Sequence, residues 1–129
     1  PLILGPDGGA ATFARDVAAA GGWEADHLTK TRLSGEEVRI APKEVDVQDR
    51  DVMIVDDIIS TGGTLATAAG MLREQGAASV RAACVHGVFA SAGYARLASA
   101  GLAAVMSSDT IESAASAYTA ADAIARALR

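Results

Sequence analysis

The sequence predicts an α/β fold with a mostly parallel β-sheet flanked by helices on both faces. Short apolar runs alternate with alanine-rich segments of helical character along the chain, the pattern of folds in which a crossover helix follows each parallel strand. The length of 129 residues is enough for one domain with its own core. Half of the residues are hydrophobic but only 4% are aromatic, so we expect a core of aliphatic side chains and alanine.

The first half of the chain is predicted to contain most of the sheet. Gly21 and Gly22 end the first alanine-rich segment, and Pro42 interrupts a long polar stretch. We expect strands at 1–4, 23–29 and 52–55, helices at 12–20 and 65–75, and a loop or loose hairpin over 30–48. The chain begins inside an apolar run without an initiating methionine, which suggests a piece of a longer protein.

The second half continues the alternation of strands and helices. Gly76 ends the second predicted helix. We expect strands at 79–85 and 102–106, turns at 86–89 and 107–110, and helices at 91–100 and 119–128. Ligands of such sheets bind beyond the carboxyl ends of the strands, so the turns that follow strands are the candidate sites.

Composition argues against several classes of function. The net charge is −5 without a basic patch, which argues against a nucleic-acid partner. The sequence contains no apolar stretch long enough to span a bilayer and no signal-like leader, so we expect no membrane partner and a cytoplasmic location. Cys84 is the single cysteine, which excludes an internal disulfide and favours a buried, inert thiol.

The most informative segment joins a buried strand to a helix. The apolar run Val52–Val55 is followed by Asp56 and Asp57, whose carboxylates can accept hydrogen bonds from sugar hydroxyls. Between them and the predicted helix lies a turn rich in hydroxyl groups and glycine: Ser60, Thr61, Gly62, Gly63 and Thr64. Free backbone N–H groups at a helix N-terminus favour a phosphate, and glycine lets the backbone approach it closely.

This segment has a plainer interpretation, in which a buried strand ends in a solvated Asp pair and a glycine-rich turn. We favour a site for a phosphorylated sugar, because acids, hydroxyl groups and glycines occur together in the order that such a ligand requires.

A second turn on the same predicted edge is Pro6-Asp7-Gly8-Gly9, between the first strand and the first helix. It is a further candidate for binding an anion. Asp7 is placed to hold a divalent cation together with substrate phosphate. Pro-Asp-Gly is also a common turn sequence, so the neighbouring sugar-phosphate motif is what favours the functional interpretation.

Lys30 and Arg32 lie at the start of the polar stretch. In an extended segment, side chains at i and i+2 point the same way, so these cations could clamp a transferring phosphoryl chain. The alternative is a solvated basic pair that forms weak surface ion pairs with Glu36 and Glu37.

Three further polar residues follow predicted strands. His86 follows the strand at 79–85, and Asp109 and Thr110 follow the strand at 102–106. Each has a structural alternative, a buried histidine in one case and a helix N-cap in the other. The sequence contains no Cys/His spacing that suggests zinc.

The segment from 52 to 64 resembles the phosphoribosyl pyrophosphate motif of phosphoribosyltransferases and ribose-phosphate pyrophosphokinases. One departure is Ser60, where the pattern usually carries a further Asp. Five motifs in order resemble the C-terminal half of ribose-phosphate pyrophosphokinases over essentially the whole chain: Pro-Asp-Gly-Gly, Lys-x-Arg, Val-Asp-Asp-Ile-Ile-Ser-Thr-Gly-Gly-Thr, His-Gly-Val-Phe and Ser-Asp-Thr-Ile.

The resemblance implies a single phosphoribosyltransferase-like domain over 1–129, the C-terminal domain of a two-domain enzyme. Its reaction transfers the pyrophosphoryl group of ATP to ribose 5-phosphate, giving phosphoribosyl pyrophosphate and AMP. Lys30 and Arg32 would be the catalytic cations and Asp7 would help to hold Mg²⁺. Asp56, Asp57 and the 60–64 turn would hold ribose 5-phosphate.

The resemblance also implies that this chain would lack part of the ATP site. In this family the N-terminal domain carries much of the ATP site, including a metal-ligand histidine, and the subunits form homo-oligomers with ATP between them. We therefore expect the chain alone to bind ribose 5-phosphate without turnover. Two alternatives stay open, a phosphoribosyltransferase that joins phosphoribosyl pyrophosphate to a nucleobase and a non-catalytic regulator that binds phosphoribosyl pyrophosphate.

Overall fold

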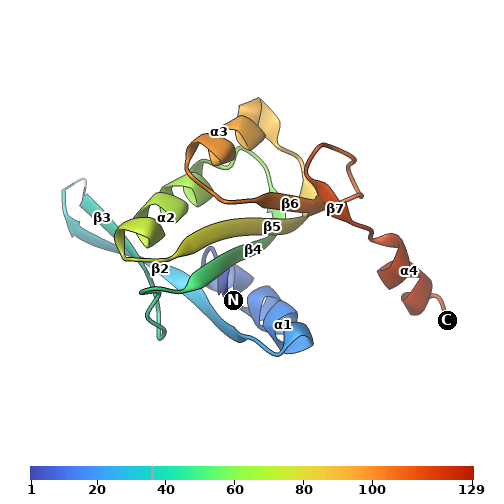
Figure 1. Ribbon diagram of the computed structural model, residues 1–129, viewed down its shortest axis with the longest axis horizontal. Coiled ribbons are helices and arrows are strands. Elements are labelled where there is room, and N and C mark those ends of the chain that lie inside the picture. Colours follow the sequence, from blue (N-terminus) through green and yellow to red (C-terminus); the bar gives the residue numbers. More distant parts are fainter. Residues whose placement is uncertain (36) are drawn as a thin grey trace.

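The computed structural model describes residues 1–35 and 37–129, with the side chains at 32, 33, 37 and 38 outside the description. Its centre is a seven-stranded sheet of order β3-β2-β1-β4-β5-β6-β7 (Figure 1). The strands are β1 (Leu2–Gly5), β2 (Glu24–Ser34), β3 (Glu37–Pro42), β4 (Asp51–Ile59), β5 (Ser79–Gly87), β6 (Val105–Ser108) and β7 (Ser116–Tyr118). The helices are α1 (Ala11–Gly21), α2 (Gly63–Glu74), α3 (Gly93–Ser99) and α4 (Ala121–Ala127), with short 3-10 turns at Gly8–Ala10 and Ala90–Ala92.

The strand pairings confirm the predicted mostly parallel sheet. β1 lies parallel to β2 and β4, and β4, β5, β6 and β7 continue in parallel. The exception is β3, which pairs antiparallel with β2 as a hairpin. The carboxyl ends of β1 and β4 therefore meet at one edge, where ligands of such sheets bind.

Helices cover both faces of the sheet, as predicted. On one face α1 packs over β1, β2 and β4 around a small cluster of Ile3, Ala14, Ala18 and Val55. On the other face α2 and α3 cover a larger aliphatic cluster that includes Leu4, Ile54, Leu72, Val80 and Leu97. Successive residues of β5 therefore point in turn toward the α1 layer and toward the layer of α2 and α3.

The structure differs from the sequence expectation in the length of two strands. β4 continues to Ile59, so Asp56 and Asp57 lie inside the strand and not after it. The pairing with β5 continues on both sides of Asp57, since Asp56 pairs with Cys84 and Ile58 pairs with His86. β2 continues to Ser34 and pairs with β3, so the first part of the expected loop or loose hairpin over 30–48 is a β-hairpin.

The C-terminal region also differs from the expectation. The predicted strand at 102–106 is β6, shifted to Val105–Ser108, and the short strand β7 was not predicted because its polar sequence lacks an apolar run. The predicted helix at 91–100 is a 3-10 turn followed by α3. Cys84 is buried as a free thiol, as expected. Among the described residues, no helix has the length and hydropathy needed to cross a membrane.

Candidate functional site

The turn between β4 and α2 exposes the start of a helix. Gly62 is the N-cap of α2 and has a φ of 76° in the left-handed region, which glycine adopts without strain. No side chain in the described part of the chain caps this helix end. The first N–H groups of α2 are therefore free to bind an anion.

Asp56 and Asp57 occupy consecutive positions of β4 and line the same cleft. The Asp57 amide donates a 2.9 Å hydrogen bond to Asp56 Oδ1, and the Ile58 amide donates a 2.8 Å bond to Asp57 Oδ1. Each carboxylate is thus held by the next backbone N–H.

Asp7 stands opposite these acids at the end of β1. Its Oδ1 accepts a 3.0 Å hydrogen bond from the Ala10 amide and caps the short turn Gly8–Ala10. Burial raises the pKa of Asp56 to about 6, and the neighbouring charges of Asp57 and Asp7 add to this shift. The three carboxylates therefore repel one another, an arrangement that a cation or hydroxyl donors would relieve.

Two adjoining clefts connect these groups. One, of about 260 Å³, is lined by Asp7, Asp56 and the whole 60–64 turn. The other, of about 460 Å³, is lined by Asp7, Asp56 and Asp57 and by the start of α1. Asp7 and Asp56 line both clefts. The structure thus brings together all the residues that the sequence predicted for sugar, phosphate and metal.

The turn is supported from behind by α3, a contact that the sequence did not predict. A Cβ at Gly93 would lie 2.5 Å from the Ser60 carbonyl oxygen. Arg96 of α3 donates hydrogen bonds to the carbonyl oxygens of Thr61 and Ser91. These residues lie more than 30 positions from the turn in sequence, and a glycine and an arginine in a helical segment carry no recognisable signal.

The structure does not bring Lys30 to these clefts. Lys30 is exposed on β2 and pairs with Ile40 of β3, and the side chain of Arg32 lies outside the description. Gln75, beyond the C-terminal end of α2, donates a hydrogen bond to the Ile40 carbonyl. Since α2 starts at the phosphate turn, this contact holds the hairpin near the far end of that helix (Figure 1).

His86 forms part of a polar network at the ends of β5 and β6. Its Nδ1 lies 2.9 Å from Thr110 Oγ1, and that hydroxyl donates to the Val85 carbonyl at 3.1 Å. Ser108 Oγ also donates to Val85 O, at 2.6 Å. Neither cleft is lined by His86, so its contacts in the described part of the chain tie two strands together. Asp109 accepts a 2.9 Å hydrogen bond from the Ala120 amide, which lowers the pKa of its carboxyl.

Comparison with known families agrees with this geometry. Residues 1–112 match the phosphoribosyl transferase domain. The chain belongs to the phosphoribosyl transferase domain family. A curated relative from Methanosarcina acetivorans, named ribose-phosphate pyrophosphokinase, is 46% identical over 129 residues, which are 100% of this chain and 46% of the relative. A relative of the same name from Methanopyrus kandleri is 48% identical over 110 residues, 85% of this chain and 38% of the relative.

Two solved structures share the fold of this chain. The phosphoribosylpyrophosphate synthetase of Mycobacterium smegmatis superposes with a TM-score of 0.77 at 29% identity, over 99% of this chain and 43% of that one. The orotate phosphoribosyltransferase of Aeropyrum pernix also shares the fold, with a TM-score of 0.62 at 23% identity. The match covers 82% of this chain and 58% of that one. These comparisons confirm the predicted resemblance to ribose-phosphate pyrophosphokinases. The chain spans less than half the length of the curated relatives described here.

Proposed function

We propose that this chain is the ribose 5-phosphate-binding part of a ribose-phosphate pyrophosphokinase. The observation that carries the proposal is the convergence of Asp7, Asp56 and Asp57 with the uncapped start of α2 around two adjoining clefts. The acids suit a polyhydroxylated sugar, and the helix N-terminus suits its phosphate. The names of the curated relatives support the same substrate.

In the proposed complex the 5-phosphate lies in the 60–64 turn. The free N–H groups at the start of α2 donate to its oxygens, and the Ser60, Thr61 and Thr64 hydroxyls lie in the same cleft wall. The ribose hydroxyls at positions 2 and 3 donate to the carboxylates of Asp56 and Asp57. The 1-hydroxyl then points out of the cleft toward the second substrate.

The proposed reaction transfers a pyrophosphoryl group from ATP. The oxygen of the ribose 1-hydroxyl forms a bond to the β-phosphorus, the bond between that phosphorus and the α,β-bridging oxygen breaks, and AMP leaves with this oxygen. The proton of the hydroxyl passes to solvent. Lys30 and Arg32 neutralise the charge of the moving group, a role that requires the β2–β3 hairpin to lie closer to the clefts than it does in the structure.

The family implies a Mg²⁺ ion, and the residues present fit one. Asp7 lines both clefts and has one carboxylate oxygen engaged in its turn, which leaves the other for a cation. The described residues include no group of three or more His, Cys, Asp or Glu side chains that could hold a metal by themselves. Asp7 would therefore share the ion with phosphate oxygens, and the bound ion would supply charge neutralisation.

The test uses the longest natural chain that contains this sequence, supplied with Mg²⁺, ATP and ribose 5-phosphate. We expect AMP and phosphoribosyl pyrophosphate to form in equal amounts. Absence of AMP, with phosphoribosyl pyrophosphate still binding, would contradict pyrophosphoryl transfer, and a panel of nucleobases would then distinguish a transferase from a non-catalytic binder. Calorimetry on the 129-residue chain measures ribose 5-phosphate binding separately, with Asp57→Asn as the variant expected to lose it.

A further inference from the structure

The root of the β2–β3 hairpin, which carries Lys30, is fixed by two side chains. The first is Asp26 of β2, which is only 9% exposed. Its Oδ2 accepts hydrogen bonds from the amides of Glu44 at 2.7 Å and Val45 at 3.0 Å, shortly after the end of β3. Hydrogen bonds to a carboxylate are stronger than those between neutral groups, so Asp26 ties the outgoing strand of the hairpin to the returning chain.

The second side chain comes from outside the hairpin. Gln75, the C-cap of α2, donates a hydrogen bond from Nε2 to the carbonyl oxygen of Ile40 in β3. Ile40 is only 3% exposed and belongs to the same buried cluster as Leu72 of α2. Figure 1 shows β3 beside this end of α2. The helix therefore holds one residue of the hairpin through both its backbone and its side chain.

The residue that Gln75 holds is the direct partner of Lys30. Lys30 and Ile40 lie opposite each other in the antiparallel pair, and side chains of opposite residues share one face of such a pair. Because Ile40 faces the cluster under α2, the exposed Lys30 also leaves the hairpin on the α2 side of the sheet. The 60–64 turn lies on the same side, at the start of α2.

α2 thus connects the phosphate turn to the partner of Lys30. Its 12 residues span about 18 Å, and Gln75 lines neither cleft. A change at Gln75 therefore leaves the groups proposed to hold ribose 5-phosphate in place. It changes instead the range of orientations open to the hairpin, because a two-stranded element has little stability of its own.

We propose that Gln75 is a positioning residue for Lys30 and acts through the backbone of Ile40. This inference rests on the proposed function, in which Lys30 neutralises the charge of the moving pyrophosphoryl group. The Gln75 amide limits the orientations of the hairpin root, so that more molecules reach the arrangement that the reaction requires. Without this bond the same arrangement is selected from a wider range, which lowers kcat.

The first test compares donors in the longest natural chain, supplied with Mg²⁺, ATP and ribose 5-phosphate. Gln75→Met keeps the length of the side chain but removes the donor. We expect kcat to fall about threefold to thirtyfold, while the dissociation constant for ribose 5-phosphate changes by less than about twofold. Gln75→Lys restores a donor of sufficient length and should recover most of the loss.

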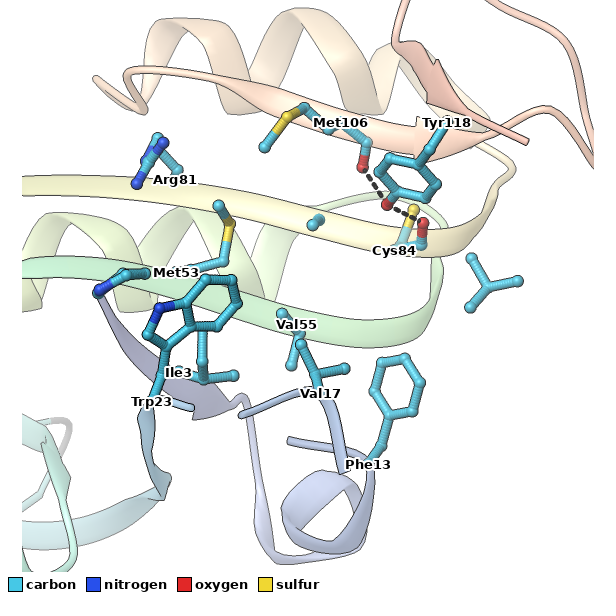
Figure 2. A pocket seen from close by; sticks show the side chains of 13 residues that line it. Ile3, Phe13, Val17, Trp23, Met53, Val55, Arg81, Cys84, Met106 and Tyr118 are labelled. Atoms are coloured by element: carbon cyan, nitrogen blue, oxygen red, sulfur yellow. Dashed lines mark hydrogen bonds between the residues drawn. The ribbon is translucent and has the colours of Figure 1, made fainter. Parts of the chain in front are cut away.

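Tyr118→Phe is the matched control for a lost hydrogen bond. The Tyr118 hydroxyl also donates to a backbone carbonyl oxygen, that of Cys84 at 2.5 Å, but on the α1 side of the sheet (Figure 2). This variant should leave kcat within about twofold of the natural value. An equal loss of kcat in Tyr118→Phe and Gln75→Met would overturn the proposal, since it would show a general effect on the fold.

The second test repeats Gln75→Met in a Lys30→Ala background. No further loss of kcat is expected, because the position of an absent ammonium group has no effect. A further loss as large as in the natural chain would overturn the proposal. A kcat that is unchanged or raised by Gln75→Met alone would also overturn it, and a raised kcat would show that the bond holds the hairpin away from the clefts.

A third test reports on the hairpin without activity. Nitroxide labels at Thr31→Cys and Ser99→Cys, in the 129-residue chain with Cys84→Ala, give the distance between the hairpin and α3 by electron spin resonance. Gln75→Met should broaden the distribution of this distance, and an unchanged distribution would overturn the role of Gln75 alone. A natural chain that forms no AMP would instead contradict the proposed function, and with it the role of Lys30.

Discussion

Gly93 packs so closely against the carbonyl oxygen of Ser60 that no space remains for a side chain at position 93. A Cβ at position 93 would lie 2.5 Å from Ser60 O and 3.0 Å from Thr61 O. The N-terminus of α3 thus sets the position of the backbone of the phosphate turn. A substitution at Gly93 has to move either α3 or the turn, because the Ser60 and Thr61 oxygen atoms that the new Cβ would meet belong to the backbone.

We expect Gly93→Ala to weaken ribose 5-phosphate binding about tenfold and to lower the free energy of unfolding by about 1–3 kcal/mol, the usual cost of overpacking. The measurements are calorimetric titration and urea denaturation. Gly70→Ala is the matched control, since a Cβ at this helical position meets nothing within 4 Å. It should leave binding unchanged and raise stability by about 0.5–1 kcal/mol. Equal binding by both variants would contradict the support role of α3.

Arg96 should be a positioning residue for the same turn. Its guanidinium donates to the carbonyl oxygens of Thr61 and Ser91, so Arg96→Ala should loosen the turn and lower ribose 5-phosphate affinity about threefold to tenfold. Arg73 offers a matched control, because it donates to the Gly101 carbonyl at 2.5 Å, away from both clefts. Arg73→Ala should cost similar stability without a loss of affinity, as measured by the same titration.

The pKa of Asp56 makes stability depend on pH in the absence of divalent cations. Burial and the neighbouring acids raise this pKa from 3.8 to about 6, so between these values the folded state binds a proton that the unfolded state has released. The contribution of Asp56 to stability therefore falls as the pH rises from about 4 to about 6, and stays low above that range.

Asp56→Asn removes this penalty. Above pH 6 the variant should be more stable than the natural chain by about 1 kcal/mol, a figure discounted because solvent screens a partly exposed carboxylate. Below pH 4 the two proteins should have equal stability, which provides an internal control. Urea denaturation with a chelator present measures both. A stability difference that is constant across this range would contradict the raised pKa.

The grouping of the candidate site residues could be predicted from sequence because most of them are close together in the chain. Asp56, Asp57 and the 60–64 turn are neighbours in the chain, and the rule that ligands bind at the carboxyl ends of strands placed Asp7 beside them. The supports of that site are not local. Gly93 and Arg96 contact the turn across a long separation in sequence, and a single sequence holds no pattern that pairs them with it.

The extent of the strands was harder to predict than their existence. β4 runs through two aspartates, because its hydrogen bonds to β5 involve the backbone and not the acidic side chains. β2 was predicted to end at residue 29, where its apolar character is lost. It continues to Ser34 because pairing with β3 satisfies the polar backbone, and this pairing places Lys30 on a hairpin.

The last prediction concerns Lys30 in the longest natural chain that contains this sequence. If its ammonium group neutralises charge only while the pyrophosphoryl group moves, Lys30→Ala should lower kcat by about 100-fold or more. The dissociation constant for ribose 5-phosphate should change by less than about twofold, because Lys30 lines neither cleft. The rate of AMP formation and a calorimetric titration give the two quantities.

Lys43 provides the control, since it is the other lysine of the chain and is also exposed, just beyond the end of β3. Lys43→Ala removes the same charge near the base of the hairpin and should leave kcat within about twofold. Activity that survives Lys30→Ala would refute the catalytic role of the hairpin. An equal loss in both variants would show that net charge near the hairpin, and not the position of one ammonium group, determines the rate.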